Sequence, residues 1–153
     1  MSAEDRVKEL GLDLSNPPKP AGNYVPAIRV GNIVYLSGHG PVRPDGTSVT
    51  GKVGAELSVE EGYDAARLVG IGLLSSLKAQ LGSLDKVRRV VKTLGMVNAA
   101  PDFTDHPQVI NGASDIFREV FGENGIGARS AVGMGSLPFQ IPVEVEMIIE
   151  VEG

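Results

Sequence analysis

The chain has 153 residues, of which 42% are hydrophobic and 22% are charged, a composition that fits one globular domain and argues against disorder. Its formal net charge of −5 disfavours a nucleic-acid partner, because phosphate binding needs clustered Lys and Arg. The absence of Cys excludes disulfides, thiol nucleophiles and Cys-ligated zinc, and two His are too few for a His-rich metal site.

The N-terminal part is predicted to hold one short helix and a hairpin. Residues 3–11 suit a helix that ends at a glycine, and the three prolines within residues 15–22 require an extended connection. Two apolar runs, residues 24–30 and 33–36, flank Gly31-Asn32, a dipeptide typical of tight turns. These runs predict two paired strands.

Two longer helices are predicted in the middle of the chain, one on each side of a strand. Ser58 and Glu61 have the spacing of a capping box, and the apolar stripe that follows continues to residue 81, just before a glycine. Residues 87–97 are rich in Val and predict a strand. Residues 105–122 predict the second helix, with a proline in its first turn.

The last part of the chain predicts two more strands, at residues 129–135 and 143–152. In the second of these, apolar residues alternate with glutamates, which is typical of a strand with one buried face. The order of strands, helix, strand, helix and strands indicates an α+β fold, in which two helices back one face of a single mixed sheet. The short N-terminal helix is an addition to this plan.

Several classes of site are absent from the sequence. No apolar run approaches the ~18 residues of a membrane helix, and the N-terminus lacks the basic-then-apolar order of a signal peptide. Gly70-Ile71-Gly72 falls inside a predicted helix, so it does not suit a nucleotide-binding loop. We therefore expect a cytoplasmic protein with no metal, no cofactor, no membrane association and no nucleic-acid partner.

Arg129 and Glu144 are the first candidate functional residues. Arg129 begins a predicted strand that carries no other charge, and its planar fork of donors suits a two-point grip on a carboxylate. The alternative is an ion pair with a strand glutamate. If the two C-terminal strands pair antiparallel, Glu144 returns close to Arg129 and could orient or deprotonate a water molecule. Otherwise Glu144 is one of several glutamates on a solvated face.

Four further residues could line the same cleft. Tyr24 begins a predicted strand and is either core filler or a donor at the rim. Ser37 ends an apolar strand among small residues that leave room for a ligand, although turn formation explains those residues equally well. His39 could titrate near neutrality, or be solvated or hydrogen-bonded in a turn. Asn111 falls about opposite the apolar stripe of its helix, where a solvated side chain is the alternative.

Taken in order and spacing, residues 20–153 resemble the Rid/YjgF family, formerly called endoribonuclease L-PSP proteins. The most specific segments are Arg129-Ser130, Leu137-Pro138 and residues 143–146. The supporting segments are Gly22-Asn23-Tyr24, residues 31–38 with Pro41, and Asp102-Phe103 leading to Asn111. On this basis residues 20–153 are the family domain, and residues 1–19 are an N-terminal helix with a proline-rich lead-in.

The resemblance implies a chorismate-mutase-like subunit that forms a homotrimer with clefts between subunits. It also implies that reactive 2-imino acids, with their enamine forms, are hydrolysed there to 2-oxo acids and ammonia without a cofactor. At matching positions, Arg129 corresponds to the arginine that binds the substrate carboxylate, and Glu144 to the acid that positions water. Tyr24, Ser37 and Asn111 correspond to other cleft residues.

Two positions depart from the family pattern. Active members often carry Cys two residues after the arginine, where this chain has Ala131, and the usual Ser-Gly-Gln is here Ser37-Gly38-His39. Both Ala131 and His39 would change the cleft, so the substrate stays open. Three functions are compatible with the resemblance: a 2-imino acid deaminase, a non-catalytic trimer that senses a small carboxylate, and an endoribonuclease, which the acidic charge disfavours.

Overall fold

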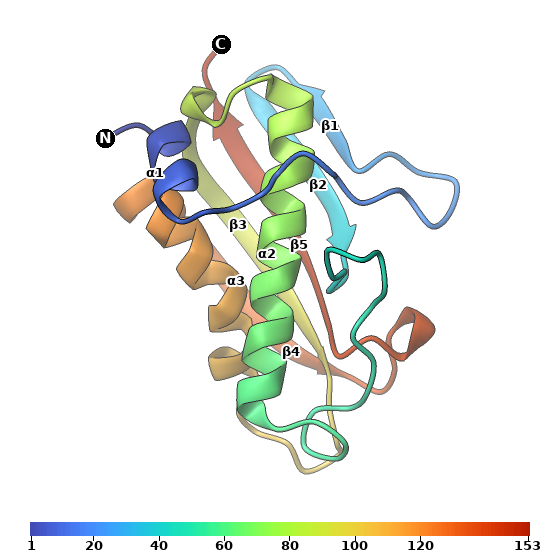
Figure 1. The fold of residues 1–153 in the computed structure, drawn as a ribbon. Coiled ribbons are helices and arrows are strands. Elements are labelled where there is room, and N and C mark those ends of the chain that lie inside the picture. The colour runs from blue at the N-terminus through green and yellow to red at the C-terminus, as the bar shows by residue number, and fades with distance from the viewer.

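A five-stranded sheet with two long helices on one face forms the body of the protein (Figure 1). The computed structural model describes residues 1–153. Its α-helices are α1 (Ala3–Glu9), α2 (Val59–Leu81) and α3 (His106–Phe121), and its strands are β1 (Ala27–Val30), β2 (Ile33–His39), β3 (Val87–Asn98), β4 (Ala128–Met134) and β5 (Val143–Val151). Three short 3-10 turns complete it: η1 (Leu84–Lys86), η2 (Gly122–Gly125) and η3 (Pro138–Gln140). The expected α+β class with a single mixed sheet is confirmed.

The strand order is β1-β2-β5-β3-β4, in which β3 and β4 are parallel and every other pair is antiparallel. A parallel pair needs a crossover connection, and α3 supplies it between β3 and β4. The prediction that the two C-terminal strands pair antiparallel is therefore wrong. β3 lies between β4 and β5, although only a short connection separates those two strands in the sequence.

Element boundaries differ from the predicted ones mainly in the first hairpin. β1 begins at Ala27 rather than at residue 24, since Pro26 has no N–H to donate to the ladder. β2 continues past residue 36 to His39, with an irregularity in its pairing with β5 just before that residue. The predicted capping box at Ser58 is present, and Gly82 ends α2 as expected.

The core lies between the sheet and the helices. Every second residue of β5 from Val143 to Val151 is buried, so this side of the strand packs under α2, as the alternation predicted, while α3 packs on β3 and β4. The two helices approach each other closely at Gly112, where a side chain would collide with the backbone carbonyl of Tyr63. This close approach holds α3, and the residues on it, at a fixed distance from α2.

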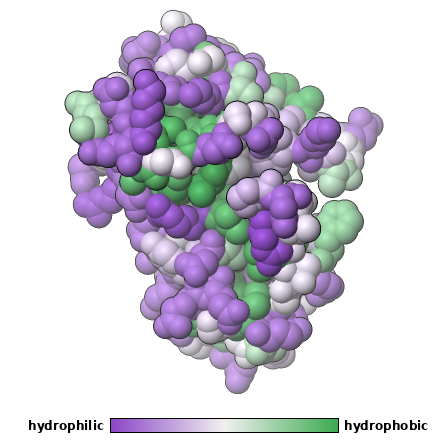
Figure 2. Space-filling view, in the orientation of Figure 1, coloured by the Kyte–Doolittle hydropathy of each residue, from purple (hydrophilic) through white to green (hydrophobic).

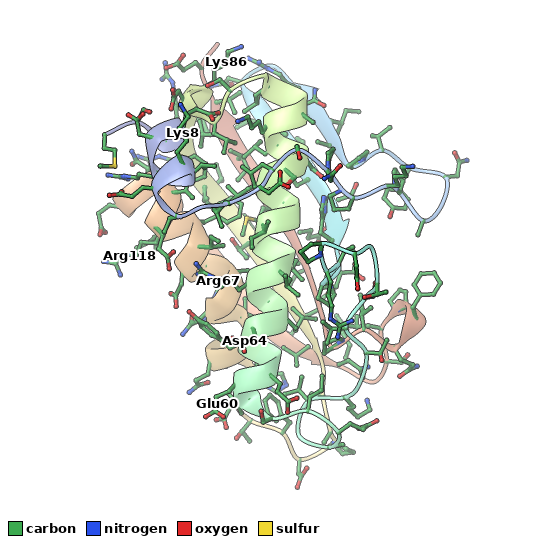
Figure 3. All side chains as sticks on the ribbon, in the orientation of Figure 1. Lys8, Glu60, Asp64, Arg67, Lys86 and Arg118 are labelled. Carbon is green, nitrogen blue, oxygen red and sulfur yellow. The ribbon has the colours of Figure 1, made fainter.

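The two outer surfaces of the molecule differ in polarity. Figure 3 shows Glu60 and Asp64 on the outer side of α2, and Figure 2 shows the helical face as largely hydrophilic, with hydrophobic side chains gathered in the hollow beside α1 and α2. No helix covers the other face of the sheet. There Tyr35 and Val132 are 46% and 38% exposed, so this uncovered face carries exposed apolar side chains.

The N-terminal segment is attached to the body by polar contacts. The carboxylate of Glu4 accepts hydrogen bonds from Nζ of Lys78 and from the backbone N–H of Leu84, both at 2.8 Å.

The division of the chain into residues 1–19 and 20–153 stays a prediction. None of the helices is both long and apolar enough to span a membrane.

Candidate functional site

The residues singled out from the sequence fall on opposite faces of the sheet. Arg129 of β4 is in register with Thr93 of β3, which is in register with the buried Met147 of β5. Glu144 is three residues before Met147 on β5 and is in register with Met96 of β3, so it belongs to the set of positions whose side chains point the other way. Because side chains alternate along a strand, Arg129 points to the helices and Glu144 to the uncovered face. The expectation that Glu144 lies close to Arg129 is therefore wrong within one subunit.

Arg129 is held by α3 through neutral oxygen atoms. Its Nη1 donates to Oδ1 of Asn111 at 2.7 Å and to Oγ of Ser114 at 3.2 Å, and its Nη2 donates to the carbonyl of Pro107 at 3.5 Å. The four salt bridges of the structure all join other residues. The alternative that Arg129 pairs with a strand glutamate is therefore wrong within one subunit, and so is a purely solvated role for Asn111. The guanidinium is oriented but keeps its charge unpaired.

One acidic residue, Asp115, lines the same hollow of about 240 Å³ as Arg129. The hydroxyl of Tyr63 donates to Oδ2 of Asp115 at 2.6 Å. This hydrogen bond, together with burial, raises the pKa of Tyr63 to about 12, so the phenol stays protonated at neutral pH and remains a donor to the carboxylate. Asp115 is thus hydrogen-bonded to α2 and forms no ion pair with Arg129.

Glu144 belongs to a second, larger hollow at the end of β2. Tyr24, Ser37 and Glu144 line this cavity of about 720 Å³, which we call the β2 cavity. Burial raises the pKa of Glu144, and the charge of the neighbouring Glu146 adds to the effect. Gly38 leaves the room that this side chain needs, because a Cβ there would collide with the Glu144 carboxylate. A carboxylate with a raised pKa is a stronger base toward water.

Ser37 and Tyr24 are positioned by the backbone around them. Ser37 donates from Oγ to the carbonyl of Val25 and from its N–H to the carbonyl of Pro26, the latter at 2.9 Å. The hydroxyl of Tyr24 accepts from the N–H of Ala21 at 3.1 Å, and the Tyr24 side chain is 47% exposed. Tyr24 is therefore a residue of the cavity rim, and the alternative that it fills the core is wrong.

His39 lies beneath the β2 cavity and is buried. Its Nδ1 is 2.6 Å from the carbonyl of Ser37, and its Nε2 is 2.7 Å from Oγ of Ser76 on α2. A carbonyl can only accept, so Nδ1 carries the proton, and the neutral ring accepts at Nε2 from the Ser76 hydroxyl. Burial lowers the pKa of His39. His39 is thus a neutral, hydrogen-bonded link between α2 and the strand end that carries Ser37.

Ala131 shares the helix-facing side of β4 with Arg129. It is in register with Gly95 of β3 and packs against the hydrophobic core. The small side chain therefore lies at the edge of the core, two positions from Arg129 on the same face.

No group of three or more acidic, His or Cys side chains is placed to hold a metal ion.

Sequence reasoning missed three residues that shape the two hollows. Ser114 follows Asn111 by three positions, so helical spacing alone could have placed it beside Arg129. Gly38 was noted only as a small residue, and its contact with Glu144 depends on the β2–β5 pairing. Phe139 lines the β2 cavity with a backbone φ of 58°, a conformation that no sequence signal indicates for a Phe.

The sequence is similar to a described family and to curated proteins within it. A family model described as "YjgF/chorismate mutase-like, putative endoribonuclease" matches residues 4–150. TCP17 of Trypanosoma cruzi is 43% identical over 145 residues, which cover 94% of this chain and 91% of that protein. The 2-iminobutanoate/2-iminopropanoate deaminase of Escherichia coli is 29% identical over 135 residues, which cover 87% of this chain and 91% of that enzyme.

Solved structures share the whole fold. Protein Atu1372 of Agrobacterium tumefaciens, described as having unknown function, has a TM-score of 0.89 and 44% identity, covering 99% of this chain and 94% of that one. A protein of Shewanella oneidensis described as a "putative endoribonuclease" has a TM-score of 0.93 and 30% identity, covering 99% of this chain and 100% of that one. The structural similarity to both proteins therefore extends over the N-terminal segment as well as the sheet.

The burial of neutral His39 predicts a pH-dependent contribution to stability. Because the pKa of His39 is lowered from its usual 6.5, the unfolded chain takes up a proton below about pH 6.5 while the folded chain does not. The contribution of His39 to the free energy of unfolding should be complete above pH 6.5 and fall below it, by at most about 1.4 kcal/mol per pH unit. Urea unfolding of wild type and His39→Gln at pH 7.5 and 5 measures this.

The difference in unfolding free energy between the two proteins should be larger at pH 7.5 than at pH 5. Other titrating groups, including Glu144 with its pKa shifted the other way, are common to both proteins and cancel in that difference. An equal difference at both pH values would mean that His39 does not stay neutral in the folded protein.

Proposed function

Because the chain belongs to the YjgF/chorismate mutase-like family, known also as the Rid family, we propose that it hydrolyses 2-imino acids to 2-oxo acids and ammonia at a site completed between subunits. The observation that carries this proposal is the guanidinium of Arg129, oriented by neutral acceptors and left without a carboxylate partner. The Escherichia coli relative acts, by its name, on 2-iminobutanoate and 2-iminopropanoate, whose carboxylates suit such a cation.

Arg129 would bind the carboxylate of the substrate. A guanidinium has five N–H donors, and the contacts with Asn111, Ser114 and Pro107 orient it without neutralising it. The donors that remain can form a two-point grip on a planar carboxylate. Such a grip would fix the position of the adjacent imine carbon, which is already electrophilic, and positioning of this kind supplies much of the acceleration of such reactions.

Glu144 would act on the attacking water. Its raised pKa makes the carboxylate a better acceptor for the proton that water gives up as its oxygen bonds to the imine carbon. The electron pair of the C=N bond then passes to nitrogen, which takes up a proton to form an amine. The hydroxyl proton then passes to the amine nitrogen, and rupture of the C–N bond releases the 2-oxo acid and ammonia, with one water consumed.

A second subunit is needed for this chemistry, because Arg129 and Glu144 point to opposite faces of one sheet. In a homotrimer, the uncovered face of one subunit could pack beside α3 and β4 of the next and bring both residues to one cleft. The exposed apolar side chains of that face support this arrangement, since large apolar patches are seldom left in water. Tyr24, Ser37 and Asn111 would then line the same cleft from two subunits.

Two other functions fit the site less well. A protein that only binds 2-oxo acids would use Arg129 in the same way, but a second carboxylate would then weaken binding of the anion, so the placement of Glu144 favours catalysis. Ribonuclease activity is disfavoured by the net charge of −5, because binding a polyanion needs clustered cations. Saturable binding of 2-oxo acids without turnover of any imine would support the first of these alternatives.

Replacing Arg129 should weaken the binding of a small 2-oxo acid. In Arg129→Ala, pyruvate affinity should fall roughly ten- to 150-fold, which corresponds to about 1.5–3 kcal/mol for a hydrogen bond to a charged group. Arg129→Lys should recover little, because an ammonium cannot form the planar two-point grip. Calorimetric titration with pyruvate measures both. Arg67→Ala is the matched control, since it removes a partly exposed arginine of α2 that pairs with Glu119. Wild-type affinity in folded Arg129→Ala would contradict the assignment.

Replacing Glu144 should affect turnover more than binding. Glu144→Gln keeps the size of the side chain but removes the base, so turnover should fall about 10²–10⁴-fold. Pyruvate affinity should stay the same or rise, because a carboxylate that opposes binding of the anion is removed. The assay uses imines made in solution by an amino-acid oxidase. Glu150→Gln is the matched control, because Glu150 lies on the same strand and face and pairs with Arg89. Similar losses in both variants would remove the case for Glu144 as the base.

A further inference from the structure

The β2 cavity is much larger than a small 2-imino acid needs. Its volume is about 720 Å³, whereas a cavity of about 150 Å³ already holds a benzene ring. Within one subunit, a three-carbon substrate with its reacting carbon beside Glu144 would therefore leave most of this space unfilled. The unfilled part of the cavity can take a larger substituent.

Part of the wall around this space is apolar and rigid, although Lys19, Ser48 and Glu146 also line the cavity. Four of the residues that line the cavity are prolines, at positions 18, 20, 26 and 138. Proline has no backbone N–H and a fixed φ, so such a wall offers flat apolar rings and few hydrogen-bond donors. It suits a hydrocarbon group better than a polar one.

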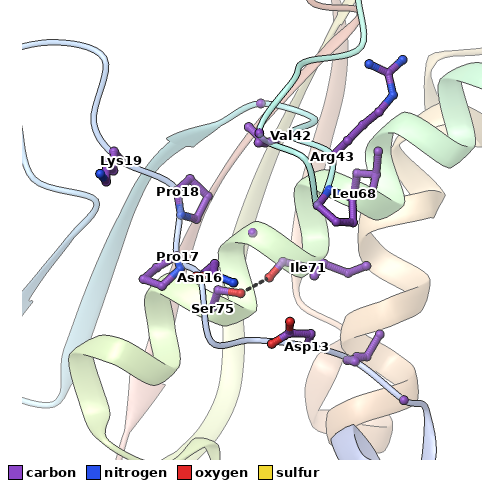
Figure 4. Close-up of a pocket in the computed structure, with 16 residues that line it drawn as sticks. Asp13, Asn16, Pro17, Pro18, Lys19, Val42, Arg43, Leu68, Ile71 and Ser75 are labelled. Atoms are coloured by element: carbon purple, nitrogen blue, oxygen red, sulfur yellow. Dashed lines mark hydrogen bonds between the residues drawn. The ribbon is translucent and has the colours of Figure 1, made fainter.

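A contact with α2 holds one part of this wall, at Pro18, in place. Pro18 and Val42 also line a neighbouring cavity of about 660 Å³, and Figure 4 shows the segment from Asn16 to Lys19 crossing α2 there. The ring of Pro18 packs on Gly72 of α2, where an added Cβ would lie 3.2 Å from Cγ of Pro18. The lead-in that precedes the sheet therefore forms a fixed part of the β2 cavity.

Phe139 adds an aromatic ring to the same cavity. Its side chain is 76% exposed, and its backbone φ of 58° is one that side-chain-bearing residues rarely adopt. The next residue, Gln140, has a φ of 57°, and its carbonyl accepts from the N–H of Gly51 at 2.9 Å. The neighbouring segment thus fixes a left-handed turn that keeps the ring out of the core. Residues held in this way cluster at ligand sites.

We propose that the preferred substrates are 2-imino acids with an aromatic or branched apolar side chain, which packs against Phe139 and the proline wall of the β2 cavity. This inference rests on the proposed function and adds the substrate class to it. The carboxylate and the imine carbon keep the contacts with Arg129 and Glu144 described above, and the side chain takes no part in the bond changes.

Turnover of imines with side chains of different size tests this proposal. Imines made by an amino-acid oxidase from alanine, leucine and phenylalanine are compared at equal enzyme concentration. The kcat/KM for the phenylalanine-derived imine should exceed that for the alanine-derived imine at least about ten-fold, the usual effect of filling an apolar pocket. Phe139→Gly should lower the first value by on the order of ten-fold and leave the second within about two-fold.

The variant and its control separate the ring from the backbone. Glycine favours a positive φ, so Phe139→Gly should keep the turn, with a melting temperature equal to or above that of wild type. Gln140→Gly makes the same backbone change one residue further on, and should leave the turnover of both imines unchanged. A preference for the alanine-derived imine, or equal losses for both imines in Phe139→Gly, would overturn the proposal.

The remaining outcomes distinguish this proposal from the proposed function. If wild type turns over no imine, but binds phenylpyruvate at least about ten-fold more tightly than pyruvate and loses this preference in Phe139→Gly, the deaminase function fails and the side-chain subsite stands. If neither turnover nor that preference is found, both fail. If Phe139→Gly breaks up the oligomer, Phe139 belongs to a subunit interface and the subsite is wrong.

Discussion

The position of β3 between β4 and β5 is the constraint on which the rest of the site depends. It places Arg129 on the helix-facing side of the sheet and Glu144 on the uncovered side, in two separate hollows. Each hollow alone has half of what hydrolysis of an imine needs: one offers an unpaired cation and the other a base. The proposed chemistry therefore requires that two copies of the chain meet, and the uncovered, partly apolar face of the sheet is the surface on which they would do so.

The body of the fold prepares each hollow before any partner arrives. The close approach of α2 and α3 at Gly112 fixes α3, whose Asn111 and Ser114 then orient Arg129. At the β2 cavity, His39 joins the end of β2 to α2, next to the backbone that carries Ser37. Both arrangements use neutral hydrogen-bonding groups, which orient side chains without neutralising the charges that a substrate would meet.

Much of the fold could be predicted because its signals are local. The capping box at Ser58 and the alternation along β5 each arise within a few neighbouring residues, and both are present. The pairing of β4 was predicted wrongly because strand order depends on the crossover through α3, which short-range patterns do not report. The sequence predicted that Arg129, Glu144 and the other candidate residues line one cleft. They do line hollows, but the hollows lie on two faces of the sheet, and this division follows from the pairing of β4. Phe139 was missed because nothing local marks its left-handed turn.

Mixing of inactive subunits tests most directly whether the site is completed between copies. Arg129→Ala and Glu144→Gln chains are mixed in equal amounts before assembly, and imine turnover is measured on the purified oligomer. If each site of a cyclic trimer takes Arg129 from one copy and Glu144 from the next, one site in four receives two intact residues, so about a quarter of wild-type activity should return. Replacing the Glu144→Gln chain by a chain with both substitutions should restore none. Mixed oligomers that stay as inactive as either variant alone would contradict the account.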